Sequence, residues 1–253
     1  MKILAIDSSG LVASAAVMEF GDAPVMTAEY TINFKKTHSQ TLIPMLDEIK
    51  RMIDLDLGTI DAIAIAAGPG SFTGLRIGSA TAKGLGLALD KPIISVPTVD
   101  ALAFNLCGTD KLICPIMDAR RGQVYTGLYT CSGNQCQVVR EQCAVMIDEI
   151  VEDINKLGRE TIFLGDGVPV FAEQLKEIMT VPYLFAPPHM SRQRAGAVGV
   201  LAYEYYLKEE DETVRNAEMS SHIQTAAEHK PEYLRLSQAE RELAEKQNTK
   251  KEK

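Results

Sequence analysis

The chain has 253 residues, 46% of them hydrophobic and 24% charged, so it can bury a sizeable core as one large domain or two small ones. No apolar run approaches the roughly 20 residues of a membrane span, and Asp7 interrupts the apolar start before any leader pattern forms, so we expect a cytoplasmic protein without membrane contact. The net charge of −8 disfavours independent RNA binding, whose affinity comes mainly from Lys and Arg side chains that neutralise phosphates.

The first part of the chain predicts an antiparallel meander followed by alternating helices and strands. Apolar alternation and apolar runs give the strands, and apolar residues at helical spacing give the helices. The βββαβα order is predicted over residues 3–6, 12–20, 25–34, 39–53, 61–67 and 71–89. We expect Pro44 near the first turn of its helix, where proline is tolerated. A strand over 93–96 and a helix from Thr98 or Asp100 to Leu106 follow.

After Gly108 the same βββαβα order starts again. Its elements are predicted over residues 112–117, 123–131, 137–145, 147–157, 161–164 and 168–179, with a last helix over 195–207. Such a repeat predicts an α/β fold of two similar lobes, 1–107 and 108–208, each with a mixed sheet. Residues 209–253 form a polar, charged C-terminal extension, which we expect to dock through 231–240. One continuous sheet is the alternative, but each meander leaves it without an orderly strand sequence.

A glycine-rich turn opens the helix over 71–89. Unpaired N–H groups at a helix start can hold an anion, so Gly68, Gly70 and Ser71 are weak candidates for a vestigial nucleotide site. Asp7, at the end of the first strand, joins them because a carboxylate there could hold Mg²⁺. The turn matches no dinucleotide or Walker-type motif, and glycines that merely permit a tight turn explain it at least as well.

The same helix carries small residues at every fourth position, which form one continuous ridge on an α-helix. They are Gly70, Gly74, Gly78, Ala82 and Gly86. Interior glycines cost about 0.5–1 kcal/mol each relative to alanine, so close approach of another helix is the natural compensation. That helix belongs either to this chain or to a second protein. The methionine-rich apolar face of the helix over 39–53 favours a second protein.

Side chains for catalysis are few. The five cysteines are an odd number without a C-x-x-C pair, so we expect reduced structural thiols at Cys107, Cys114, Cys131, Cys136 and Cys143. Four histidines stand far apart and predict no metal site: His38, His189, His222 and His229. Asp118 follows a strand as Asp7 does, but Arg120 and Arg121 crowd its turn, so we interpret it as a turn aspartate. No Ser-His-Asp arrangement can be read from the sequence.

Several stretches resemble the TsaB (YeaZ) family of bacterial tRNA threonylcarbamoyladenosine biosynthesis proteins. They cover residues 3–9, 68–78, 91–96 and 118–125, and the run over 68–78 is the most specific. Residues 231–235 with Ala239 and Glu240 are similar to that family's C-terminal signature. The resemblance covers residues 1 to about 207 in order, and the tail from Leu243 matches nothing in it.

This resemblance implies two lobes of the actin/Hsp70-like, ribonuclease H-like fold and a noncatalytic subunit rather than an enzyme. Members pair with a catalytic paralogue, TsaD, and a small ATPase, TsaE, and form homodimers when alone. The assembly makes N6-threonylcarbamoyladenosine at position 37 of tRNAs that read codons beginning with A, and tRNA contact would be indirect. The paralogue's two metal-binding histidines fall at Thr98 and Leu102, so ATP, Mg²⁺ and the catalytic metal would belong to partners.

The family also implies that the helices over 39–53 and 71–89 form the partner surface. Combined with the small-residue ridge, this predicts a partner interface of Leu42, Met45, Leu46, Ile49, Phe72, Gly74, Leu75, Gly78 and Ala82. The alternative function is a free-standing ATP-dependent kinase of the same fold, against which Arg120 and Arg121 argue. A peptidase would need a metal or nucleophile site that the sequence does not display.

Overall fold

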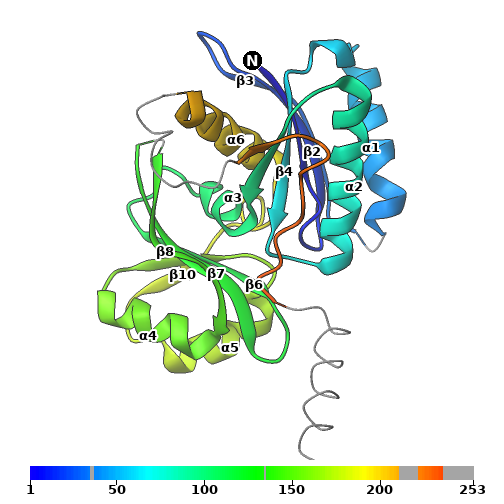
Figure 1. Cartoon of the computed structure of the whole chain (residues 1–253). Coiled ribbons are helices and arrows are strands. Elements are labelled where there is room, and N and C mark those ends of the chain that lie inside the picture. The colour runs from blue at the N-terminus through cyan, green and yellow to red at the C-terminus, as the bar shows by residue number, and fades with distance from the viewer. Residues whose placement is uncertain (35–36, 134, 211–221, 236–253) are drawn as a thin grey trace, which may run out of the picture.

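The computed structural model describes residues 1–34, 37–133, 135–210 and 222–235, which form two mixed β-sheets flanked by helices (Figure 1). The first sheet comprises β1 (Lys2–Asp7), β2 (Ala13–Glu19), β3 (Val25–Ile32), β4 (Ala62–Gly68), β5 (Ile93–Pro97) and β11 (Ile223–Gln224). Its strand order is β11-β5-β4-β1-β2-β3. Strand β1 pairs antiparallel with β2 and parallel with β4, so the predicted meander and mixed sheet are confirmed.

The second sheet repeats this arrangement. It comprises β6 (Leu112–Asp118), β7 (Gln123–Ser132), β8 (Gln135–Met146), β9 (Thr161–Leu164) and β10 (Tyr183–Phe185). Its order is β10-β9-β6-β7-β8, with β6 antiparallel to β7 and parallel to β9. The predicted α/β fold with two βββαβα units is therefore confirmed.

Each sheet is covered by helices on both faces. The helices are α1 (His38–Met52), α2 (Phe72–Leu89), α3 (Thr98–Phe104), α4 (Ile147–Leu157), α5 (Val168–Ile178) and α6 (Ala195–Glu210), with a short 3₁₀ helix at Leu57–Thr59. Helices α1 and α2 cover one face of the first sheet and α6 the other (Figure 1). Helices α4 and α5 cover the second sheet from below, and α3 packs on its opposite face.

Two helices thus cross from one half of the chain to the sheet of the other. Helix α3 follows β5 of the first sheet, yet Val99, Leu102 and Leu106 pack against Ile113 and Met117 of β6. Helix α6 comes late in the chain, yet Val198 packs in the core of the first sheet. The domain boundaries at residues 107 and 208 remain a prediction. Each half of the chain contributes one helix to the core of the other half's sheet.

Short strands and helix starts differ from the sequence expectations. Helix α1 begins at His38, which places Pro44 well inside it rather than in its first turn. Strands β10 and β11 have only three and two residues, and their pairing is imposed by β9 and β5.

The C-terminal segment 222–235 lies against the body of the molecule. It starts at the edge of the first sheet, where β11 pairs antiparallel with β5, and continues toward the second sheet as the orange and red segment of Figure 1. The predicted docking range runs to residue 240, and residues 236–240 lie outside the described part of the chain.

The expectation of five reduced thiols is wrong for two cysteines. Cys131 and Cys136 are joined by a disulfide, while Cys107, Cys114 and Cys143 are free. The β7–β8 hairpin places Cys131 directly opposite Cys136 in the ladder, with a Cα–Cα distance of 4.2 Å. Strand register, which the spacing of cysteines along the chain does not display, brings the two sulfurs together.

No helix within the described ranges combines the length and apolar character needed to cross a membrane.

Candidate functional site

A cleft of about 310 Å³ lies where the two sheets approach one another. Parallel strands of α/β sheets end at such crevices, which is where ligands of this fold class are held. The lining comes from the first sheet's turns, the second sheet's turns and the C-terminal segment: Ser9, Gly10, Leu11, Gly70, Ser71, Phe72, Met117, Asp118, Ala119, Arg120, Tyr125, Asp166, Glu232, Tyr233, Leu234 and Arg235.

The C-terminal segment forms one wall of this cleft and connects its two sides. The backbone N–H of Glu232 donates to the carbonyl of Ala67 at 2.7 Å, at the end of β4. The ring of Tyr233 lies 4.9 Å from that of Phe72, centroid to centroid. On the opposite side, the guanidinium of Arg235 donates to the carbonyl of Ala119. The chain's own tail therefore occupies part of the space between the sheets.

Asp7 is buried beside the cleft, and its carboxylate is held by the turn that follows β1. Its Oδ1 accepts hydrogen bonds from the backbone N–H and hydroxyl of Ser9, at 2.9 and 2.6 Å. Burial raises the pKa of Asp7 to about 6, against the opposing effect of the Ser9 hydrogen bonds. Asp7 serves as the anchor of its own turn here.

The glycine-rich turn uses its polar groups internally. The hydroxyl of Ser71 accepts from the N–H of Gly74 at 3.3 Å and caps α2, and the N–H of Ser71 donates to the carbonyl of Ser9 at 2.7 Å. Gly68 has a φ of 132°, and its N–H donates to the hydroxyl of Thr98. A Cβ at Gly70 would meet the Ser9 carbonyl at 2.3 Å. The turn thus fits closely against the chain, as the tight-turn interpretation requires.

On the opposite side of the cleft, Asp118 is tied to its own turn. It accepts from the N–H of Arg120 at 2.8 Å and forms an ion pair with the Arg120 guanidinium at 3.0 Å. Its N–H donates to Asp166, whose pKa burial raises. Arg120 has a φ of 67° and lines the cleft, so a large side chain stands where a phosphate loop needs small ones.

The two positions at which the resemblance places metal ligands in the catalytic paralogue are both buried. Thr98 accepts from Gly68, and Leu102 packs in the core between α3 and the second sheet. A threonine hydroxyl and an aliphatic side chain in these places cannot supply imidazole ligands.

The small-residue ridge of α2 faces this chain's own core, which corrects its interpretation as a free partner surface. A Cβ at Gly74 would meet the Ser8 carbonyl at 2.1 Å, and one at Gly78 would meet the Ser8 hydroxyl at 2.3 Å. A Cβ at Gly86 would contact Ala226, and Ala82 is completely buried. The ridge allows α2 to lie close to the end of β1. A bulky residue at Gly78 would disturb this packing before it met any partner.

Most of the other predicted interface residues are likewise turned inward. Leu42, Met45, Ile49 and Leu75 are 1–4% exposed and belong to the core or its edge, whereas Leu46 and Phe72 are only partly buried. These predicted interface residues therefore lie on the face that packs on the sheet, because apolar residues at helical spacing mark a buried face of this chain as well as they mark a partner surface.

The outward faces of α1 and α2 nevertheless carry exposed apolar side chains. Ile43 on α1 is 56% exposed and Leu87 on α2 is 68% exposed, whereas Met52, 66% exposed, lies at the end of α1 on the side of Met45 and Ile49. Gly84 also faces outward, and apart from its chain neighbours and the backbone of its own helix turn no atom of the described residues lies within 4 Å of where its Cβ would be. Packing within this chain therefore does not account for a glycine there, unlike Gly74 and Gly78. It escaped the sequence analysis because it lies outside the four-residue register of the ridge.

Comparisons with known proteins agree with this fold. Residues 27–243 match the family model described as "TsaD: tRNA N6-adenosine threonylcarbamoyltransferase". The Bacillus subtilis "tRNA threonylcarbamoyladenosine biosynthesis protein TsaB" is 31% identical over 247 residues, which cover 98% of this chain and all of that protein. The Escherichia coli protein of the same name is 34% identical over 181 residues, covering 70% of this chain and 76% of the other.

A solved structure described as "YeaZ from Pseudomonas aeruginosa" superposes with a TM-score of 0.71 at 22% identity, covering 92% of this chain and 99% of that one. At this identity the likeness supports the actin-like fold alone. The full-length similarity to the Bacillus subtilis protein and the match of the family model over 27–243 carry the assignment. The chain belongs to the TsaB family of tRNA threonylcarbamoyladenosine biosynthesis proteins.

Proposed function

We propose that this chain is a noncatalytic, partner-activating subunit of the complex that forms N6-threonylcarbamoyladenosine at position 37 of tRNAs reading codons that begin with A. In this proposal it works in the cytoplasm and pairs with a TsaD-type catalytic paralogue, together with a TsaE-type ATPase. When the paralogue is missing, the chain forms a homodimer through the surface that otherwise binds the paralogue. The observation that carries the proposal is family membership combined with a cleft whose polar groups are already used by the chain itself.

The arrangement of the cleft supports a noncatalytic role. Asp7 bonds to Ser9, Ser71 caps α2, and Asp118 pairs with Arg120, so each candidate group already has a partner in its own turn. Tyr233 and its neighbours form a wall of the space. Under this proposal the chain needs no cofactor of its own, and ATP, Mg²⁺ and the catalytic metal are bound by the partner subunits.

The outward faces of α1 and α2 are the proposed partner surface. The two helices pack beside one another on the same face of the first sheet (Figure 1). The exposed residues assigned to this surface are Ile43 on α1 and Gly84 and Leu87 on α2. An exposed helix-interior glycine costs about 0.5–1 kcal/mol relative to alanine, and close approach of a partner helix compensates for it. The net charge of −8 leaves most of the positive surface for tRNA to the partners.

Depletion of the protein in its source organism tests the function directly. Mass spectrometry of nucleosides from total tRNA should show loss of threonylcarbamoyladenosine, and a plasmid copy of this chain should restore it. Retention of the modified nucleoside at full level after depletion would remove the proposal.

Calorimetry separates the proposal from a free-standing kinase of the same fold. The isolated chain, titrated with Mg-ATP, should give no turnover, because the carboxylates of the cleft are engaged and Arg120 stands in the second turn. ATP hydrolysis or phosphate transfer by the isolated chain, abolished by Asp7→Asn, would establish the kinase alternative instead.

A further inference from the structure

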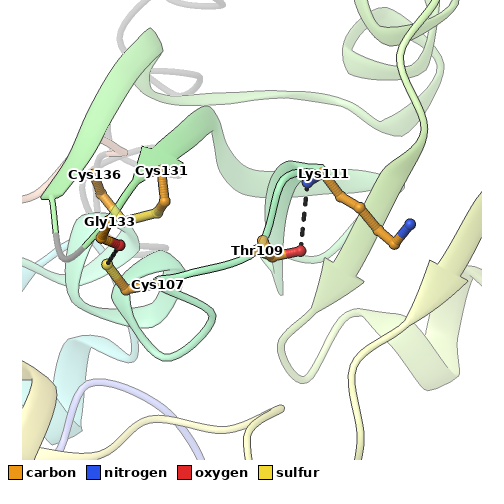
Figure 2. Close-up of a disulfide and its surroundings, with 6 residues drawn as sticks. All are labelled: Cys107, Thr109, Lys111, Cys131, Gly133 and Cys136. Atoms are coloured by element: carbon orange, nitrogen blue, oxygen red, sulfur yellow. Dashed lines mark hydrogen bonds between the residues drawn. A yellow bond between two sulfur atoms is a disulfide. The ribbon is translucent and has the colours of Figure 1, made fainter.

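Three cysteine sulfurs converge beside the β7–β8 hairpin, away from the cleft. The Sγ atoms of Cys107, Cys131 and Cys136 all lie within 4.8 Å of one another. Figure 2 shows Cys107 pointing from the turn after α3 toward the hairpin that carries the disulfide, and its thiol donates to the carbonyl of Gly133 at 3.6 Å. None of the three is deeply buried, so a small ion in solution can reach the group.

The geometry points to a site for a thiophilic divalent cation such as Zn²⁺, formed by the thiolates of Cys107, Cys131 and Cys136 once the hairpin disulfide is reduced. Zinc binds Cys sulfur at about 2.3 Å in tetrahedral geometry, so ligand sulfurs lie roughly 3.8 Å apart. The sulfur of Cys107 lies within 4.8 Å of both others, and reduction of the hairpin disulfide lets the sulfurs of Cys131 and Cys136 move apart to that separation. We expect a water molecule to complete the tetrahedron, since the three cysteines are only partly buried.

The spacing of the hairpin pair fits this chemistry. Four residues separate Cys131 from Cys136, within the C-x₂₋₄-C range common in zinc sites, and the turn between them contains Gly133 with a φ of 59°. Cys107 comes from a distant part of the chain, in the turn after α3. No sequence pattern joins it to the other two, because the packing of α3 on the second sheet creates the group.

The reduction and the metal binding balance as two steps. A dithiol reductant attacks the Cys131–Cys136 bond and becomes a cyclic disulfide, while the two cysteines take up two electrons and two protons. Binding of the cation then releases the thiol protons of all three cysteines to solvent, so affinity rises with pH.

The test uses the full chain, reduced under anaerobic conditions, freed of reductant and titrated with Co²⁺. We expect thiolate-to-cobalt charge-transfer absorption and the intense d–d bands of a tetrahedral ion, at a stoichiometry of a single ion per chain, and displacement by Zn²⁺. The untreated, disulfide-containing chain should give neither signal. Absence of these bands from the reduced chain, or equal bands from the oxidised chain, would overturn the proposal.

Variants identify the ligands. Loss of a group that only supports a metal ligand lowers metal affinity roughly 10- to 100-fold. Since Cys107 and Cys131 bind the ion directly in this proposal, Cys107→Ser and Cys131→Ser should each weaken Co²⁺ binding by more than that. Cys143→Ser is the matched control and should bind as the unaltered chain does. As a readout that does not depend on colour, Zn²⁺ should raise the unfolding temperature of the reduced chain but not that of reduced Cys107→Ser. Unchanged affinity in Cys107→Ser would contradict the three-thiolate site.

Discussion

Gly78 and Gly84 stand six residues apart in α2, and their surroundings predict opposite effects of the same substitution. A Cβ at Gly78 would lie 2.3 Å from the Ser8 hydroxyl and 3.3 Å from Ile65, inside a packed core. We expect Gly78→Ala to destabilise the chain by about 1–3 kcal/mol, the usual cost of overpacking. At Gly84 the space is open, so Gly84→Ala should stabilise the chain by about 0.5–1 kcal/mol. Urea unfolding of both variants measures the difference, and an equal effect of the two substitutions would contradict the inward-facing ridge.

Asp7 makes the stability of the chain depend on pH. Its pKa is about 6 in the folded state against about 3.8 in the unfolded state, because burial disfavours the charged form. The folded chain therefore binds the proton more tightly, and this stabilisation is present below pH 4 and lost as the pH rises to 6. Burial lowers the pKa of His229 to about 4, which destabilises the folded state at low pH. Because this effect opposes that of Asp7, the stability of the unaltered chain does not separate the two contributions.

A difference measurement isolates Asp7 from His229. Asp7→Asn keeps an oxygen that can accept from Ser9 but carries no charge. The unfolding free energy of Asp7→Asn minus that of the unaltered chain should be about 2–3 kcal/mol larger at pH 7 than at pH 4, because the pKa of Asp7 is raised by about two units on folding. Chemical denaturation of the variant and the unaltered chain at pH 4 and pH 7 measures these unfolding free energies. A pH-independent difference would mean that Asp7 titrates normally in the folded chain.

The last described residues, 231–235, are attached to the body through few contacts. Strand β11 contributes two residues, and Ala226 and His229 are buried against the first sheet. Beyond them, the described contacts of 231–235 are chiefly those of Glu232, Tyr233 and Arg235. Segments with so few backbone hydrogen bonds open locally at low free energy. Tyr233 stabilises the closed form through its ring contact with Phe72 and the hydrogen bond that its hydroxyl accepts from Arg76 at 3.4 Å.

Tyr233→Ala should therefore release this segment without unfolding the sheets. Loss of the aromatic contact, about 0.5–1.5 kcal/mol beyond buried area, should speed hydrogen exchange at the Glu232 amide by up to about tenfold. Amides of β1 and β4 should keep their protection. Tyr30→Ala is a matched control, because Tyr30 has similar exposure on β3, far from the cleft. Equal exchange at Glu232 in the two variants would show that the segment does not depend on Tyr233.

Long elements were predictable from the sequence because the regular spacing of their apolar residues follows from one face of the element being buried. Helix α4 buries Ile147, Ile150, Val151 and Ile154 at helical spacing, and its predicted and observed bounds coincide. Strands β10 and β11 were missed because two or three residues carry no readable period, and only a neighbouring strand makes them pair. The Cys131–Cys136 disulfide and its proximity to Cys107 depend on register and tertiary packing in the same way.

The position of the candidate site could be predicted from the sequence, but the partners of its side chains could not. The sequence located Asp7 and the turn over 68–71 beside one another, and the structure places Ser71 within hydrogen-bond distance of Ser9. It could not reveal that Tyr233 and Arg235 form a wall of the same cleft, since a distant tail has no spacing relation to a turn. It also could not decide which side of α2 faces the sheet, because a small-residue ridge suits a strand end and a partner helix equally well.

At the scale of the whole molecule, the two sheets are joined by more than the covalent chain. The side-chain amide of Asn105 donates to the carbonyls of Met190 and Arg192, at 3.2 and 2.7 Å, and Arg235 reaches Ala119 from the tail. Helices α3 and α6 each pack in the core of the sheet from the other half. Such connections favour a fixed relation between the two halves, and the proposed partner surface on α1 and α2 is part of that rigid body.

That rigid surface gives the last prediction. Gly84→Arg places a long charged side chain where, outside its own helix turn, no described atom lies within 4 Å of the Cβ, so the fold should tolerate it. A partner helix packed on Gly84 would be propped away, and we expect affinity for a purified TsaD-type partner to fall at least about tenfold, or about 1.4 kcal/mol. Gly21→Arg is the matched control, because Gly21 is equally open, lies in the β2–β3 turn and gains the same charge. Calorimetry and size-exclusion chromatography measure binding, and equal affinity of the two variants would move the interface away from α2.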